Sequence, residues 1–155
     1  LLEFIDDPAG RGARWLVNGG LETLRSFGIS DLPKNPDAED ATEAADALER
    51  ALPDGLQDWL RKLPLQWASG NMHCVHAAMN PDRNPEDQSE RSLIWGHPEF
   101  LHRARTDGSI VIHGHTIVTK PNFKDGRIAI DTGAHKNRPL SAVRVCLGQI
   151  EFLQA

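Results

Sequence analysis

The chain has 155 residues, of which 39% are hydrophobic and 25% charged, and its formal net charge is −5. This length predicts one globular domain rather than two, and no run of eighteen apolar residues is present to span a membrane. Because no basic block stands out, the charge argues against a nucleic-acid or anionic-membrane partner held by bulk electrostatics.

The first residues, 1–7, have neither a basic region nor a long apolar core, so they do not predict a secretory signal. The chain also lacks an initiator methionine, and we expect the natural protein to begin upstream. Two cysteines, Cys74 and Cys146, fall in apolar, strand-like runs. Two buried thiols in a chain of this length predict a reducing compartment, and hence a cytoplasmic protein.

Residues 1–63 have a helical pattern. The Asn18-Gly19-Gly20 triplet predicts a tight corner between two helices, because glycine adopts positive φ without strain, and Gly28 is expected to close the second helix. Residues 40–52 have the composition of a polar-faced helix. In residues 56–63, apolar side chains recur at the i, i+3, i+4 and i+7 positions of an amphipathic helix.

After Pro64 the pattern favours strands, with a polar loop over 80–90 and short helical segments near 93–101. A strand, a turn and a second strand are expected over 65–76, and the two C-terminal runs predict a hairpin. The expected strands are 65–68, 72–76, 109–113, 127–131, 142–147 and 150–153. We found no internal repeat and no low-complexity segment.

Potential metal ligands follow three of these strands. The first strand ends at His76, the second runs into His113-Gly114-His115, and the third ends at Asp131. In open α/β sheets, ligands bind beyond the carboxyl ends of the strands, and neutral imidazole suits Mn, Fe and Zn. We expect one of His113 and His115 to ligate and the other to pack or hydrogen-bond.

A single histidine after a strand is more often a packed or hydrogen-bonded residue than a ligand. The metal interpretation therefore depends on the three strand ends taken together and in order. Gly114 is expected to allow the backbone to turn sharply between the two histidines.

Several segments match one known family. Residues 15–28 read Trp-x-x-Asn-Gly-Gly-x-x-Thr-Leu-x-Ser-Phe-Gly, and the other matching segments are Leu63-Pro64-Leu65, Cys74-Val75-His76-Ala77-Ala78, Leu93-Ile94-Trp95, Ile112-His113-Gly114-His115-Thr116 and Asp131-Thr132-Gly133-Ala134. In these the chain resembles the C-terminal part of bacterial serine/threonine phosphoprotein phosphatases, within the calcineurin-like metallophosphoesterases. The resemblance covers nearly the whole chain.

The resemblance implies an α/β fold: the C-terminal half of a metallophosphoesterase-type β-sandwich flanked by helices. Residues 1–63 would form an N-terminal helical segment, and residues 64–155 the strand-rich half that carries the metal site. His76 and His115 would ligate the second metal of a binuclear centre, Mn by preference, with Zn or Fe as alternatives. His113 and Asp131 would lie in its supporting shell or active-site loop.

The activity implied by the resemblance is hydrolysis of a phosphorylated protein or a small phosphoester. In that family a metal-activated water attacks phosphorus, since the ions lower the pKa of the water and neutralise the phosphoryl oxygens. The partner expected for this chain is therefore a phosphoester substrate, with no nucleic acid and no membrane.

Two departures from the family pattern matter. The Gly-Asp-x-His-Gly, Gly-Asp-x-x-Asp-Arg-Gly and Gly-Asn-His-Glu motifs are absent from the 155 residues, so we expect the N-terminal half of the domain to be missing and this portion to be inactive. His97 stands where the family usually has a phosphate-binding arginine, and imidazole lacks the bidentate fork of guanidinium. Arg91 or Arg103 is expected to compensate, and Ala78 replaces a usual glycine.

Three alternatives remain open at this stage. One is a dinucleoside polyphosphate hydrolase of the same superfamily. Another is a non-catalytic fragment or binding module that keeps the fold without a binuclear centre. The third is a small metal-binding protein that uses only His76 and His115.

Overall fold

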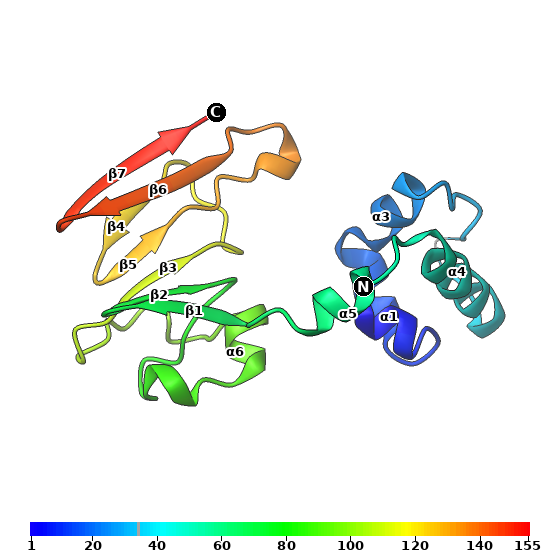
Figure 1. Ribbon diagram of the computed structural model, residues 1–155, viewed down its shortest axis with the longest axis horizontal. Coiled ribbons are helices and arrows are strands. Elements are labelled where there is room, and N and C mark those ends of the chain that lie inside the picture. Colours follow the sequence, from blue (N-terminus) through cyan, green and yellow to red (C-terminus); the bar gives the residue numbers. More distant parts are fainter. Residues whose placement is uncertain (34) are drawn as a thin grey trace. The chain divides into compact units, whose positions relative to one another are not determined.

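The computed structural model describes residues 1–33 and 35–155, which divide into two compact units, Leu1–Leu63 and Pro64–Ala155. The described residues of the first unit form helices, whereas the second contains a five-stranded mixed sheet, a hairpin and short helices (Figure 1). The chain is therefore a mixed α and β protein, as its sequence pattern predicts.

The helices of the first unit are short except for one. They are α1 (Leu2–Asp6), α2 (Gly12–Trp15), η1 (Leu16–Gly20), α3 (Leu21–Ser26), α4 (Ala38–Ala51) and α5 (Leu56–Arg61). α4 begins two residues earlier than expected because Asp37 forms a capping box with Asp40: each side chain accepts a hydrogen bond from the other residue's backbone N–H.

The two predicted glycine corners are confirmed. Gly19 has φ +94 inside the irregular turn η1, where the helical backbone breaks at Asn18. Gly28 follows α3 with φ +79, and the next residue, Ile29, donates its N–H to the Leu24 carbonyl at 3.0 Å. Together with the bond from Gly28 to Arg25, this is the double hydrogen-bond pattern that closes many helices.

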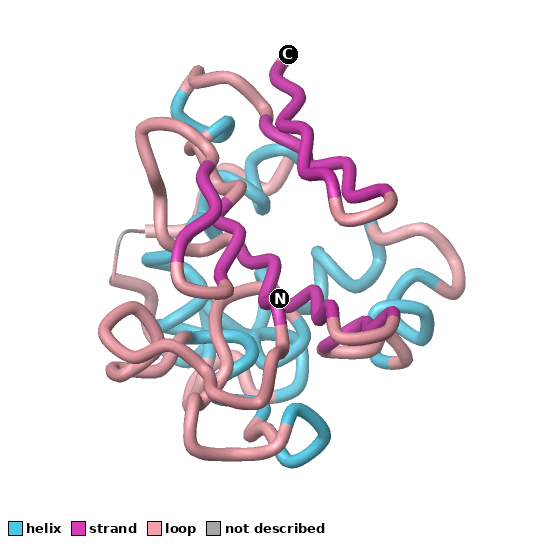
Figure 2. The backbone as a smooth tube through the Cα atoms, turned by 90° about the vertical axis from the view of Figure 1, so that its left-hand side faces the viewer, coloured by secondary structure: helices cyan, strands magenta, loops and turns pink. Residues whose placement is uncertain are grey.

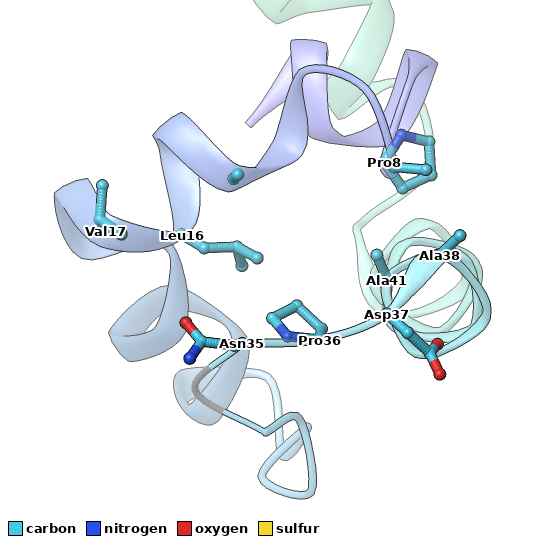
Figure 3. A pocket seen from close by; sticks show the side chains of 10 residues that line it. Pro8, Leu16, Val17, Asn35, Pro36, Asp37, Ala38 and Ala41 are labelled. Carbon is cyan, nitrogen blue, oxygen red and sulfur yellow. The ribbon is translucent and has the colours of Figure 1, made fainter.

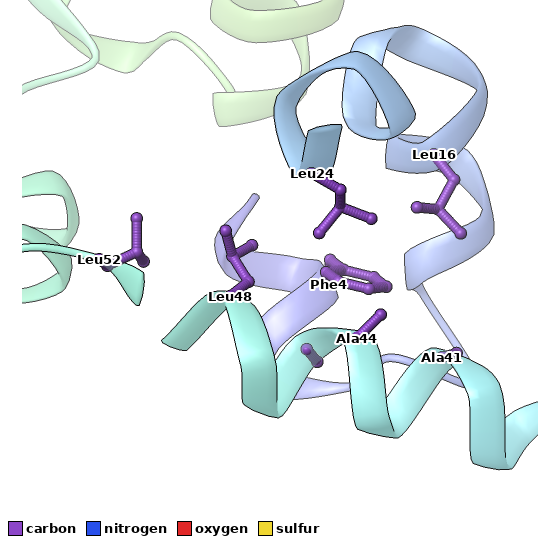
Figure 4. Close-up of a cluster of buried hydrophobic side chains, with 8 residues drawn as sticks. Phe4, Leu16, Leu24, Ala41, Ala44, Leu48 and Leu52 are labelled. Carbon is purple, nitrogen blue, oxygen red and sulfur yellow. The ribbon is translucent and has the colours of Figure 1, made fainter. Parts of the chain in front are cut away.

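The core of the first unit forms around Phe4, which is completely buried (Figure 4). The ring of Trp15 packs against it in a tilted arrangement, with centroids 4.9 Å apart. Leu24 and Leu48 are equally buried.

The expected apolar stripe of α5 is only partly buried: Leu56 packs against the core, but no residue of the helix is fully buried and Trp59 is 58% exposed. Periodicity identified the helix correctly, but the helix ends at Arg61, before Leu63 of the expected stripe.

A cavity of about 260 Å³ opens between the segment Pro8–Val17 and the start of α4 (Figure 3). Its walls are largely proline, alanine and leucine side chains, and Asp37 is its one titratable group among the described lining residues. The Oδ1 of Asp37 is engaged in capping α4.

The main sheet lies in the second unit, with the strand order β1-β2-β3-β5-β4. β2, β3 and β5 run parallel to one another, and the edge strands β1 and β4 pair antiparallel to them. The strands are β1 (Gln66–Ser69), β2 (Met72–Val75), β3 (Ile110–His113), β4 (Asn122–Lys124) and β5 (Arg127–Ala129). β4 was missed in the sequence because three exposed residues carry no alternation signal.

The chain ends in the predicted hairpin, formed by β6 (Ser141–Cys146) and β7 (Gln149–Gln154), which Figure 2 shows as the strand pair nearest the C-terminus. Its turn is Leu147-Gly148, one residue earlier than expected, and both turn residues have positive φ. Cys146 beside this turn is exposed and Cys74 is half-buried, so the expectation of two buried thiols is wrong for Cys146.

One face of the sheet carries the core of the second unit. Val111 is completely buried there against Met79 and Leu93, the latter from helix α6 (Glu90–Trp95). The opposite face carries an apolar row formed by cross-strand partners in consecutive strands: Trp67, Cys74, Ile112, Ile128 and Phe123. Both ends of this row are open, since Trp67 is 59% and Phe123 49% exposed.

Within residues 1–33 and 35–155, no helix has both the length and the apolar character needed to cross a membrane.

Candidate metal site at the carboxyl edge of the sheet

The parallel strands bring the predicted site residues to a single edge. β2, β3 and β5 are neighbours, so the residues that follow them leave the sheet side by side. Backbone hydrogen bonds extend the pairing beyond the strands: Gly114 donates to the His76 carbonyl, and Ile130 donates to the His113 carbonyl, both at 3.0 Å. His76, His115 and Asp131 are thereby placed on three adjacent strand ends.

The two imidazoles predicted as ligands converge. The Nδ1 of His115 lies 3.2 Å from the Nε2 of His76, and the rings meet at 67° with centroids 5.1 Å apart. Two nitrogens bound to one ion at about 2.1 Å, with an angle between them of about 90–110°, lie roughly 3.0–3.4 Å apart. The observed separation fits two adjacent ligands of one ion.

The turn that presents His115 is strained. Thr116 donates its N–H to the Gly114 carbonyl at 2.7 Å, and His115 between them has φ +63. This is a γ-turn of the rare form with positive φ, which a non-glycine residue adopts at a cost. The sharp turn therefore falls on His115 and not on Gly114, contrary to the expectation from the sequence.

Gly114 has a different role, which is to permit close approach. A Cβ atom at this position would lie 3.4 Å from the His76 carbonyl oxygen and 3.6 Å from the Cβ of Asp131. The glycine thus lets three strand ends pack closely, and a branched side chain here would push His76 and Asp131 apart.

His113 points into the face of the sheet that carries the core, the same face as Val111 two residues earlier. Its side chain is buried, its Nδ1 lies 3.1 Å from the Gly114 carbonyl oxygen, and its ring packs edge-on against Phe100 at 4.9 Å. Burial lowers the pKa of His113 and nearby Arg127 lowers it further, while the Gly114 carbonyl and Asp131 oppose the shift. Of the two histidines, His115 therefore faces His76, and His113 packs.

The surroundings of His76 favour its neutral form. Its pKa is lowered chiefly by burial and secondly by the neighbouring His115, against an opposing effect of Asp131. Neutral imidazole is the ligating species, so this environment favours ion binding at near-neutral pH.

Asp131 supports the edge of the sheet. Its Oδ1 accepts a hydrogen bond from the Gly133 N–H at 2.9 Å, and its carbonyl accepts one from Val118 at 2.8 Å. A cavity of about 360 Å³ lies beside it; its lining residues include Ile112, Ile130, Asp131, His76 and His115.

The residues expected to bind phosphate are only partly brought to the site. His97 follows Gly96, and its Nδ1 accepts a hydrogen bond from the Glu99 N–H at 3.3 Å, so this nitrogen is engaged locally. No contact between His97 and either site histidine is found in the described chain. Arg103 forms a two-pronged ion pair with Asp82. Arg91, the other arginine expected to compensate for His97, is an exposed residue of α6.

A contact absent from the sequence expectations involves Trp95. Its ring meets that of His115 at 90°, with centroids 6.4 Å apart. The sequence placed Trp95 in a predicted helical segment. That position alone does not predict a contact with a residue 20 positions further along the chain.

The ligand set is incomplete in the described part of the chain. Across residues 1–33 and 35–155, no three His, Cys, Asp or Glu side chains gather into a group able to hold a metal ion. His76 and His115 therefore provide two donors, and a stable site needs further ligands.

Comparison with known proteins gives no family assignment: no protein-family model matches the chain, and no curated protein matches it significantly.

Proposed function

We propose that this chain is the metal-ligating C-terminal part of a metallophosphoesterase similar to bacterial serine/threonine phosphatases. The observation that carries the proposal is the 3.2 Å approach of His115 Nδ1 to His76 Nε2 at the ends of two neighbouring parallel strands. The order of the matching motifs along the sequence supports the same family.

In this proposal His76 and His115 hold one divalent ion, Mn by preference and Zn or Fe as alternatives. The ion, when bound, lowers the pKa of a coordinated water and neutralises charge on the phosphoryl oxygens. The chain contributes the orientation of the two imidazoles. The lowered pKa of His76 favours the neutral form of that imidazole at near-neutral pH.

The two exposed ends of the apolar row support the β-sandwich that the family resemblance implies; Ile128, in the middle of the row, is already completely buried. The apolar row ends in Trp67 and Phe123, which are 59% and 49% exposed, so a second layer would bury substantial apolar area there. We propose that an upstream half-domain supplies this layer, together with the carboxylate and asparagine ligands that the described residues lack.

The proposed substrate is a phosphomonoester, with phosphoserine or phosphothreonine in a protein as the main class. Both cysteines are free, which supports a reducing compartment, and we place the activity in the cytoplasm on that basis. A second candidate, a non-catalytic binding module, is favoured by the two-donor ligand set of the described residues.

Two measurements test the proposal. The first is the titration of the 155-residue chain with Co²⁺, which we expect to bind through imidazole and to lose that binding in His115→Ala. His102→Ala removes an exposed histidine of the same unit and is the matched control. Equal binding by all three proteins would overturn the metal site.

The second measurement decides between the enzyme and the binding module. The coding sequence upstream is read, and the longer protein is assayed for Mn²⁺-dependent hydrolysis of a phosphoserine peptide. Two Asp-containing motifs and an Asn-His pair upstream, with activity lost in His115→Ala, support the phosphatase. An intact upstream region without these motifs favours the binding module.

A further inference from the structure

The ring of His115 has two aromatic neighbours, His76 at 5.1 Å and Trp95 at 6.4 Å between centroids. We propose that Trp95 is a positioning residue that holds the His115 imidazole in its ligating orientation. The inference rests on the proposed function, because the orientation matters only if His115 binds a metal ion.

His115 needs such support for two reasons. Its backbone has φ +63 in a strained turn, and its side chain lies at an exposed position. An exposed imidazole on a strained turn has several accessible rotamers, and ordering it for ligation costs conformational entropy. An edge-to-face contact with a large ring restricts those rotamers before any ion arrives, and such contacts are also favourable in themselves.

Trp95 is itself firmly placed. It is the last residue of α6, and the helix ends at Gly96, which has φ +99. The start of the helix is capped by Ser89, whose side-chain oxygen accepts from the Ser92 N–H at 3.2 Å, and Ser92 and Leu93 are buried. The helix therefore presents Trp95 from a fixed support.

The same helix is tied directly to the other ligand. Ala77, the residue after His76, donates its N–H to the Leu93 carbonyl at 2.8 Å. These contacts form a closed loop. Ala77, next to His76 in the chain, is hydrogen-bonded to α6, and Trp95 of α6 contacts the ring of His115. The Nδ1 of His115 in turn lies beside the Nε2 of His76. Both imidazoles are connected to α6, one through Ala77 and the other through Trp95. The helix therefore helps the sheet to fix the distance between the two imidazoles.

The test compares Co²⁺ binding by the full 155-residue chain and its variants. Trp95→Leu removes the ring, and we expect the Co²⁺ dissociation constant to rise on the order of tenfold, the lower range for losing a residue that orients a ligand. Trp95→Phe keeps an aromatic edge and should restore most of the affinity. Trp67→Leu removes an exposed tryptophan of β1 and should leave the constant unchanged. Equal affinity of wild type and Trp95→Leu overturns the proposal.

An NMR measurement without metal separates this inference from the proposed function. We expect nuclear Overhauser contacts between the Trp95 and His115 rings in wild type. We also expect the chemical shifts of the His115 ring to differ between wild type and Trp95→Leu. If wild type binds no Co²⁺ while these signals are present, the metal function fails and the positioning contact stands. If the His115 ring signals are the same in both proteins, Trp95 does not position His115.

Discussion

His76 and His115 are separated by 39 residues in the chain, yet the Nε2 of one lies 3.2 Å from the Nδ1 of the other. Parallel pairing of β2 with β3 produces this approach, because Val75 and His113 are direct partners and the next residues leave the sheet together. A hydrogen bond between two imidazoles requires one ring to donate and the other to accept. A bound cation would replace that proton and use both nitrogens as donors of electron pairs.

The isolated chain should not hydrolyse phosphomonoesters. Two imidazoles cannot hold two metal ions and a bridging nucleophile, and the described residues offer no third converging ligand. The measurement is Mn²⁺-dependent release of p-nitrophenol from p-nitrophenyl phosphate. Turnover by the wild-type chain that disappears in His115→Ala would contradict this expectation.

The stability of the sheet unit should fall as the pH drops below about 6.5. Burial lowers the folded-state pKa of His113 below the ordinary value of 6.5, so the unfolded chain binds the proton more readily. The contribution of neutral His113 to the free energy of unfolding is therefore complete above pH 6.5. It is lost as the pH falls toward the lowered pKa of His113.

Amide hydrogen exchange at Val111, measured in the whole chain from pH 7.5 to pH 5.5 and corrected for intrinsic rates, reports this loss. His113→Phe keeps an aromatic ring beside Phe100 and should show a shallower pH dependence, whereas His102→Phe should match wild type. Equal slopes for His113→Phe and wild type would argue against a role for His113.

Replacing His115 by glycine should separate stability from binding. The residue has φ +63, which glycine adopts freely, whereas alanine retains the steric conflict of its Cβ. We expect His115→Gly to be more stable than His115→Ala by about 1 kcal/mol. Urea denaturation measures the difference, and both variants should lose Co²⁺ binding. A less stable glycine variant would mean that the turn is not strained.

Arg105 should be far more important for stability than its neighbour Arg103. The Arg105 side chain is 6% exposed, donates to the Asn80 and Arg83 carbonyls at 2.9 and 2.8 Å, and holds the pKa of Asp107 well below its usual range.

Arg105→Met removes the hydrogen bonds to those carbonyls and the buried partner of Asp107, and should destabilise the chain by about 2 kcal/mol. The Arg103–Asp82 pair is half-exposed, so Arg103→Met should cost less than about 1 kcal/mol. Urea denaturation of the two variants provides the comparison, and similar losses would show that the Arg105 contacts carry no special weight.

In the longer protein, His97→Arg should strengthen substrate binding if position 97 touches the phosphate. Guanidinium is always charged and can hold a phosphate through two parallel hydrogen bonds, whereas imidazole lacks this fork. The engaged Nδ1 of His97 leaves only Nε2 for a substrate. The measurement is KM for wild type and His97→Arg, with Arg91→Ala in parallel. An unchanged KM for His97→Arg combined with a raised KM for Arg91→Ala assigns the phosphate contact to Arg91.

Much of the secondary structure followed from local chemistry. The short apolar run around Val111, the turn region of the C-terminal hairpin and the glycines at 19 and 28 each act over a few residues, so they can be recognised without knowing the fold. The order of the strand ends also identified His76, His115 and Asp131 as residues that meet at one edge, because parallel strands share their carboxyl edge.

Other features depended on packing that no short segment encodes. The strained turn fell on His115 because the Gly114 carbonyl is close enough to bond to Thr116, and β4 formed because its three exposed residues found β5 as a partner. The contact of Trp95 with His115 required α6 to pack on the sheet through Leu93. The sequence by itself predicted which strand ends share one edge of the sheet; only the tertiary structure decided the distances and contacts between their side chains, since these are set by the pairing of strands and the packing of helices.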